Sequence, residues 1–324
     1  MKAVAPAVQA LRLHRHPALL RRYGWLPHDL LDGAVAAATS ARLPGPLRRA
    51  LIAAWVARGG IDLTEVEVED WPTVEAFFLR RLRPEARPIA AGLVSPVDGF
   101  VVCAGEVSAD VALPIKGQRL SLDALLRVAA PTASPVGAAW RRLRGQVGAE
   151  HRAVSPVAAA EVEALRGGWQ LTVFLTPDGY HHVHCPFDAE LVEVGWLPGR
   201  TFPQNDDALR VAGPSYARNE RAVLRLRHAA GFDAWLVMVA ASLVGGIDID
   251  GLARADWMRS TPLAVGRRLH RGERLGCFRF GSTVVLALPP AALGPEPGWQ
   301  PAAFGAGAQL RLGQALLAPA DRAL

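Results

Sequence analysis

The chain has 324 residues, of which 51% are hydrophobic, so it is long enough to bury one large core or two smaller ones. Its three cysteines are odd in number and form no CxxC pair, which argues against a disulfide framework and a structural zinc knuckle and suits a reducing compartment. The formal net charge of +6 is carried by residues 1–50, which hold eight basic and two acidic side chains, so the remainder is close to neutral.

Residues 1–65 are expected to form short helices that associate with a membrane surface. The clearest helical period, over 47–60, ends at a Gly-Gly pair. Basic residues mixed with leucine and tryptophan suit an anionic lipid surface, although a solvated helical hairpin with an arginine-rich face would have the same composition. No segment reaches the roughly 18 apolar residues of a spanning helix, and basic residues interrupt any signal-like core after Lys2. We therefore expect a peripheral protein on the cytoplasmic side of the cell membrane.

Residues 66–324 are expected to form a second, mainly β domain. A further helix is predicted over 73–88, with Thr73 as its N-cap and Pro84 as its exit. After Ile89 the sequence changes to short apolar runs separated by glycine, proline and aspartate, which is typical of strands. The fold class expected from this order is α+β, with N-terminal helices followed by a mainly β catalytic core.

The densest group of chemically active side chains is TPDGYHHVHCP, residues 176–186. Histidine titrates near neutrality, so three of them within four positions favour a functional reading. A metal site, a Cys185 nucleophile and general acid/base work all remain open, as does a polar strand edge with incidental histidines. Strand alternation would place His181 and His184 on opposite faces, so a single site using both would need a bulge or a turn.

Three other features could contribute to a site. Asp98, in SPVDGFVV, precedes an apolar strand and is either a turn residue or a carboxylate that orients a histidine. Lys116 is one of only two lysines and could supply an amine, or could be an ordinary lysine before a turn. In FRFGSTVVLAL, residues 278–288, Gly281 and Ser282 interrupt an otherwise good strand, and the serine has no adjacent base in the sequence.

Taken together, six segments resemble motifs of the phosphatidylserine decarboxylases, which are pyruvoyl-dependent enzymes that make phosphatidylethanolamine. The segments, in chain order, are FFLRRLRPEARPI, SPVDG, IKGQRLSLDALL, GYHHVHCP, YARNERAV and GERLGCFRFGSTVVL. Their order and spacing make the resemblance far more specific than any single motif. The resemblance also implies an α+β fold and a homodimer.

The resemblance implies that the chain is a proenzyme that cuts itself between Gly281 and Ser282. The Ser282 hydroxyl would attack the Gly281 carbonyl, β-elimination would follow, and hydrolysis would leave a pyruvoyl group on the new N-terminus. The family assigns the base to His184, oriented by Asp98, as a Ser-His-Asp charge relay. The products would be a β chain of residues 1–281 and an α chain of residues 282–324.

The resemblance further implies that the covalent pyruvoyl cofactor, derived from Ser282, forms a Schiff base with phosphatidylserine and accepts electrons as carbon dioxide departs. His181 is assigned to this step as an acid or base, with Tyr180 in support. The substrate would lie in an anionic membrane surface, and no metal or nucleic acid is expected to take part. A His-rich metal-dependent hydrolase and a non-cleaving, membrane-binding relative are the alternatives.

Two positions depart from the family pattern. The family has Asp-Tyr-His-Arg where this chain has Gly179-Tyr180-His181-His182, so one acid and one arginine are replaced. We expect these changes to affect headgroup preference more than self-cleavage.

Overall fold

The computed structural model describes the chain over residues 28–67, 69–115, 118–128, 155, 157–204, 209, 215–241, 246–279 and 281–317. The N-terminal 27 residues of the predicted membrane-associating region lie outside the described residues, as does Lys116.

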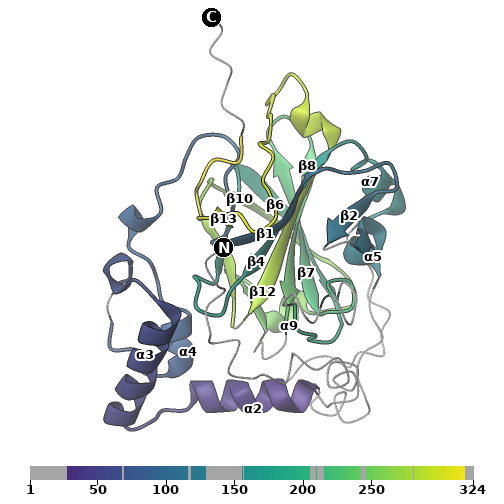
Figure 1. The fold of residues 1–324 in the computed structure, drawn as a ribbon. Helices are drawn as coiled ribbons and strands as arrows, with labels where there is room; N and C mark the ends of the chain where they lie inside the picture. Colours follow the sequence, from purple (N-terminus) through teal and green to yellow (C-terminus); the bar gives the residue numbers. More distant parts are fainter. Residues whose placement is uncertain are drawn as a thin grey trace, which may run out of the picture.

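Within the described residues, three α-helices precede the sheets and lie at one end of the molecule (Figure 1). They are α2 (His28–Ser40), α3 (Gly45–Gly59) and α4 (Val74–Phe78). α3 ends where Gly60 adopts a left-handed conformation, with φ of 63°, and its amide donates to the Val56 carbonyl. The Thr73 hydroxyl accepts from the Ala76 amide at 3.0 Å, which confirms the predicted N-cap of α4.

The helix predicted over 73–88 is much shorter than expected. α4 stops at Phe78, and a separate 3-10 turn, η3 (Pro84–Ala86), follows. The Leu79 carbonyl accepts from the His182 ring, 3.0 Å away, and the buried Arg80 side chain turns toward residues 178–179. Tertiary hydrogen bonds therefore end a helix that local periodicity would have continued.

The core is an eight-stranded sheet in which every neighbouring pair of strands is antiparallel. In spatial order the strands are β10 (Leu263–Leu269), β6 (Ala189–Leu197), β7 (Arg221–His228), β8 (Asp233–Ala240), β12 (Ser282–Leu288), β4 (Trp169–Leu175), β1 (Gly99–Glu106) and β13 (Gln309–Leu310). With the helices before it, this sheet confirms the predicted α+β class.

Each face of the large sheet is covered by smaller elements (Figure 1). A three-stranded sheet packs on one face, with the order β5 (His182–His184), β11 (Arg274–Phe278) and β9 (Ile247–Ile249). The other face carries β2 (Ala112–Ile115), β3 (Gln118–Ser121), α5 (Leu122–Arg127) and α7 (Ala159–Glu163). A short helix, α9 (Arg254–Trp257), follows β9, and η2 (Leu63–Glu65) and η4 (Pro290–Leu293) are single 3-10 turns.

The segment that looked like an interrupted strand is a central strand of the large sheet. β12 begins at Ser282 itself, lies between β4 and β8, and all seven of its residues are buried. Its side chains alternate between the two core clusters, with Val284 and Leu286 in one and Val285 in the other. The strand formers after Ser282 are therefore anchored in the core.

Candidate active site

The site is built at one end of the large sheet, where β12 begins, β4 ends and β1 begins. Ser282 pairs with Leu175, the last residue of β4, and with Ala240, the last residue of β8. Asp98 stands immediately before β1, on the far side of β4. Because neighbouring strands lie about 4.8 Å apart, Asp98 and Ser282 share this end of the sheet but are separated by the width of one strand.

Ser282 carries a hydroxyl that no described residue satisfies. Its side chain is fully buried, and its Oγ has no hydrogen-bond partner within the described part of the chain. A buried polar group without a partner costs free energy and needs a reason. A Cβ added to Gly281 would meet no described atom within 4 Å. Packing against the described residues therefore does not require a glycine before the serine.

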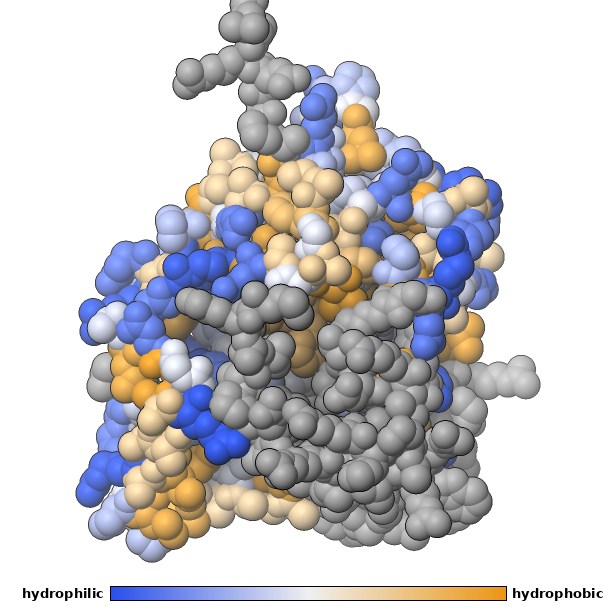
Figure 2. Space-filling model, viewed as in Figure 1, coloured by the Kyte–Doolittle hydropathy of each residue, from blue (hydrophilic) through white to orange (hydrophobic). Residues whose placement is uncertain are grey.

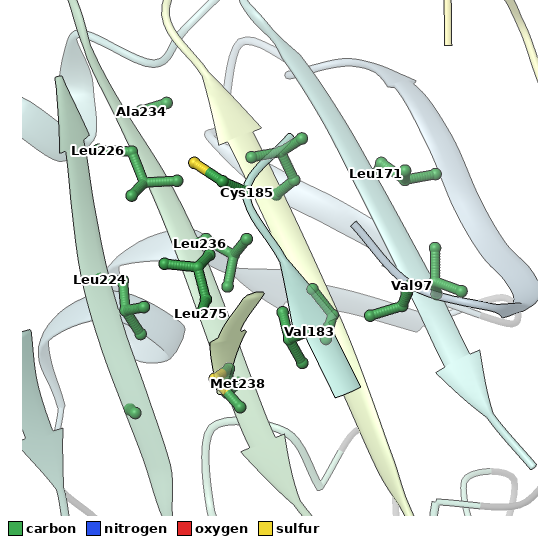
Figure 3. Packing of buried hydrophobic residues seen from close by; sticks show 14 of the residues in the cluster. Val97, Leu171, Val183, Cys185, Leu224, Leu226, Ala234, Leu236, Met238 and Leu275 are labelled. Atoms are coloured by element: carbon green, nitrogen blue, oxygen red, sulfur yellow. The ribbon is translucent and has the colours of Figure 1, made fainter. Parts of the chain in front are cut away.

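The histidine-rich segment returns to this end of the sheet directly after β4. Val183 and Cys185 point into the core cluster shared with the large sheet, among residues such as Leu236 (Figure 3). Tyr180, His182 and His184 share the opposite side, since the Tyr180 ring lies 4.8 Å from the first histidine and 5.8 Å from the second. These five side chains follow the alternation of an extended chain, and the placement of His181 opposite His184 stays a prediction from that alternation.

His184 has both ring nitrogens engaged. Its Nδ1 lies 2.8 Å from the Gly272 carbonyl oxygen, which can only accept, so Nδ1 carries the proton and donates. In the neutral ring, Nε2 then accepts from the Tyr180 hydroxyl at 3.1 Å. Burial lowers the pKa of His184 below its usual value of 6.5, which favours this neutral form.

The Asp98 carboxylate forms its hydrogen bonds with groups other than His184. Its carboxylate accepts from Arg87 Nε at 2.9 Å and from the Leu312 amide at 2.7 Å. The histidine's backbone amide donates to the Pro96 carbonyl at 2.9 Å, so the loop that carries Asp98 runs beside it. The structure brings the two predicted relay residues into the same neighbourhood, but the hydrogen bonds of their side chains go elsewhere.

His181 presents the opposite situation. The ring is fully buried, Nδ1 lies 3.1 Å from the Gly179 carbonyl, and the Phe78 ring lies 4.2 Å away. Nδ1 must donate to that carbonyl, so Nε2 is an acceptor, and no described residue donates to it. Burial, with the nearby Arg80 guanidinium, lowers the pKa of His181 to about 3. His181 is thus a neutral base with a bare lone pair.

His182, which replaces the arginine of the family pattern, is fully used as a structural group. Nε2 donates to the Leu79 carbonyl, and Nδ1 accepts from Arg274 Nη1 at 3.2 Å. Arg274, on β11, also forms an ion pair with Asp250. An arginine therefore does reach this place, but it comes from a different strand.

The other face of β12 carries a buried polar network that sequence reasoning missed. The Thr283 hydroxyl donates to Gln204 Oε1 at 2.7 Å, and Gln204 Nε2 donates to the Ala240 carbonyl at 3.1 Å. Asn219 Nδ2 donates to the same carbonyl at 2.8 Å. The segment YARNERAV adds to the buried polar groups, because Asn219 and the fully buried Arg221 bond mainly to backbone carbonyls. The glutamine gave no signal of its own, since a lone Gln in a loop is unremarkable.

Metal and thiol chemistry find little support in this geometry. In the described ranges, no three His, Cys, Asp or Glu side chains are grouped so that they could hold a metal ion. The Cys185 thiol is buried and donates to the Phe187 carbonyl, and burial raises its pKa to about 12. A thiol with that pKa is a poor nucleophile at neutral pH.

Comparison with known proteins decides the family. The model of the phosphatidylserine decarboxylase family matches residues 74–318. The chain belongs to the phosphatidylserine decarboxylase family. Among its relatives, the phosphatidylserine decarboxylase proenzyme of Brevibacillus brevis is 30% identical over 93% of this chain and 96% of its own length. Those of Anaeromyxobacter sp. and Acidovorax ebreus are 31% and 32% identical, each over 90% of this chain and 94% of its own length.

Membership in this decarboxylase family makes the chain a carboxy-lyase and replaces the metal-dependent hydrolase as its function class. The match covers the sheet end described above, with all of Asp98, His181, His184 and Ser282 inside it. No helix in the described part of this decarboxylase is long and apolar enough to cross a membrane.

Proposed function

We propose that this chain is a self-processing phosphatidylserine decarboxylase that cuts itself between Gly281 and Ser282 and works through a pyruvoyl group derived from Ser282. The observation that carries the proposal is the buried Ser282 hydroxyl at the start of a central strand, which has no hydrogen-bond partner among the described residues. A hydroxyl in that position is costly unless it reacts. The printed name of the relatives, proenzyme, agrees with a chain that is processed.

The residues present fit a pyruvoyl group at position 282. The position is buried and held by strand pairing on both sides, and no described atom lies where a Cβ of Gly281, the residue that would leave, would stand. Once formed, the ketone would serve as an electron sink for loss of carbon dioxide from the bound serine headgroup.

Self-cleavage needs a nucleophile, a base and a leaving group, and this chain supplies all three. Ser282 Oγ forms a bond to the Gly281 carbonyl carbon as the peptide C–N bond breaks, which gives an ester and a free amine. The Ser282 α-proton is then removed, the Gly281 carboxylate leaves, and water converts the dehydroalanine to the pyruvoyl group and ammonia. We assign the base to His184 and its support to Asp98; to act, His184 must exchange the Tyr180 hydroxyl for that of Ser282.

Decarboxylation is assigned to His181. No described residue donates to its buried Nε2, so this nitrogen is available as the acid or base that handles the proton at carbon as carbon dioxide leaves. Complete burial keeps bulk water from competing for that proton.

Contacts across the cut explain how the two products would stay together as an α/β heterodimer. β12, the start of the α chain, lies between β4 and β8 of the β chain, and β13 pairs with β1. The Leu312 amide binds Asp98, and Arg311 pairs with Glu65. A homodimer of this unit stays a prediction from the family resemblance.

We assign the membrane-facing surface to the N-terminal helices. Leu47 and Leu51, one turn apart on α3, are 50% and 45% exposed. Arg49, between them in sequence, is also exposed, whereas Arg48 pairs with Asp70. Apolar surface gathers over this corner of the molecule in Figure 2. Exposed leucines among arginines suit the surface of a membrane that contains anionic phosphatidylserine. The protein would then act as a peripheral enzyme on the cytoplasmic side of the membrane.

Intact mass measurement of the purified protein tests the proposal. We expect a C-terminal fragment of 43 residues, starting at position 282, whose N-terminus is blocked by a ketone. Ser282→Ala should stay full-length and should release no carbon dioxide from phosphatidylserine, whereas Thr283→Ser, which keeps the neighbouring hydroxyl, should be cut. A wild-type protein that stays full-length yet decarboxylates would refute the pyruvoyl mechanism.

A further inference from the structure

The turn that carries His181 is attached to α3 by a specific hydrogen bond. Trp55 Nε1 donates to the Asp178 carboxylate at 3.1 Å. At the end of the same helix, a Cβ added to Gly59 would lie 2.8 Å from Asp178 Cγ and 2.9 Å from its Cβ. Two independent features of α3, a donor and a missing side chain, are therefore fitted to this one aspartate.

The same turn is held from a second direction by Arg80, two residues after the end of α4. Arg80 Nη2 donates to the carbonyls of Asp178 and Gly179, at 2.7 and 2.9 Å. The Gly179 carbonyl is also the acceptor for His181 Nδ1. One carbonyl therefore connects the buried Arg80 guanidinium to the ring whose other nitrogen is bare.

Aromatic packing follows the same route. The Trp55 ring lies 6.0 Å from the Phe78 ring, and Phe78 lies 4.2 Å from His181. The orientation of the His181 ring is thus set by a hydrogen bond to Gly179 and by contact with Phe78, and both constraints lead back to α3. Since Nδ1 is tied down, the direction in which the Nε2 lone pair points depends on where residues 178–179 stand.

We propose that Trp55, acting through Asp178, is a positioning residue for His181, so that the helix assigned to the membrane surface also orients the histidine that moves the substrate proton. The inference rests on the proposed function for the role of His181, but the contacts that carry it belong to the uncleaved chain. Trp55 does not touch the reacting atoms. A lipid surface that holds α3 would, through Trp55, hold the turn in its productive position.

Two readouts test this in the full-length chain. The first is the rate at which diethyl pyrocarbonate modifies His181, followed by peptide mass in a Ser282→Ala background, which needs neither cleavage nor activity. The second is kcat and KM of the cleaved enzyme with phosphatidylserine in detergent micelles. The variants are Trp55→Phe, which keeps a ring but loses the N–H, Asp178→Ala, which loses the acceptor, and Asp178→Asn, which keeps an acceptor oxygen.

We expect Trp55→Phe and Asp178→Ala to raise the His181 modification rate and to lower kcat by about tenfold each, with KM nearly unchanged. Asp178→Asn should stay close to the wild type in both. Gly59→Ala should behave like Asp178→Ala. The matched control is Gly60→Ala, which strains the end of α3 at a left-handed residue but meets no described atom within 4 Å, and it should lack the effect of Gly59→Ala on His181.

The inference is overturned if Trp55→Phe and Asp178→Ala leave both the modification rate and kcat unchanged. It is equally overturned if Gly60→Ala has the same effect as Gly59→Ala, because the contacts would then only stabilise α3. If wild-type protein neither cleaves nor decarboxylates, the proposed function fails, and the modification rates still decide whether Trp55 orients His181.

Discussion

Two parts of the segment from Tyr180 to Cys185 differ in one chemical respect. On the face shared with Tyr180, His182 and His184 have every ring nitrogen occupied, by Leu79 and Arg274 in the first case and by Gly272 and Tyr180 in the second. His181, by contrast, has one nitrogen occupied and no described residue bonded to the other, although the ring is fully buried.

This difference shows that neighbouring histidines can have different roles, depending on whether their ring nitrogens are already hydrogen-bonded. A buried ring with both nitrogens paired is stabilised in place and must break a bond before it can react. Burying a ring nitrogen without a hydrogen bond costs desolvation free energy that no contact offsets, and such groups are typical of sites that bind a ligand. The four predictions below test that division, from the largest expected effect to the smallest.

Replacement of His184 should have the largest effect. His184→Ala is expected to abolish self-cleavage, because no other assigned group takes the Ser282 proton, and all activity is then lost. A denaturing gel of the freshly made protein would show only the full-length chain. His182→Ala is the matched control and should be cut. If His184→Ala is cut normally, the occupied face has no part in cleavage.

Replacement of His181 should separate the two chemistries. His181→Ala is expected to be cut like the wild type but to lose about 10²–10⁴-fold in kcat, the usual contribution of a positioned acid or base. Carbon dioxide release from labelled phosphatidylserine measures this loss, and the gel measures the cut. Loss of cleavage in this variant would make the bare nitrogen, rather than His184, the base for Ser282.

Replacement of His182 should affect stability alone. His182→Ala leaves the Leu79 carbonyl and one Arg274 donor without the ring, and we expect about 1–3 kcal/mol less free energy of unfolding. Urea unfolding measures this difference, with kcat of the folded fraction as the second readout. A tenfold drop in kcat without a change in stability would place His182 in the site instead.

The pH dependence of self-cleavage should show the smallest effect. Burial lowers the pKa of His184 below its usual value of 6.5, so the ring is still neutral, and able to accept a proton, at pH 6.5. The cleavage rate of refolded precursor should therefore stay at its plateau at pH 6.5 and fall only at lower pH. A rate already halved at pH 6.5 would mean that the base titrates like an exposed histidine.

Much of this molecule could be predicted from local sequence. Short apolar runs separated by glycine, proline and aspartate indicated the strands, the Gly-Gly pair indicated the end of α3, and the order of six motifs indicated the family. Alternation also separates His182 and His184 from Val183 and Cys185, because successive side chains on an extended chain point to opposite sides whatever the fold.

The partners of the site residues were decided by tertiary structure. The sequence gives no sign that Asp98 binds Arg87 and Leu312, that Arg274 reaches His182, or that Gln204 holds Thr283. Several of these pairs are separated by about 80 to more than 200 positions in the chain, and they meet only because antiparallel strands bring their ends together. The early end of α4 has the same cause, since the Leu79 carbonyl accepts a hydrogen bond from His182, which lies 103 residues away in the chain. Local periodicity determines which elements form and which face each residue takes, whereas the identity of a polar partner depends on which distant element the topology places opposite it.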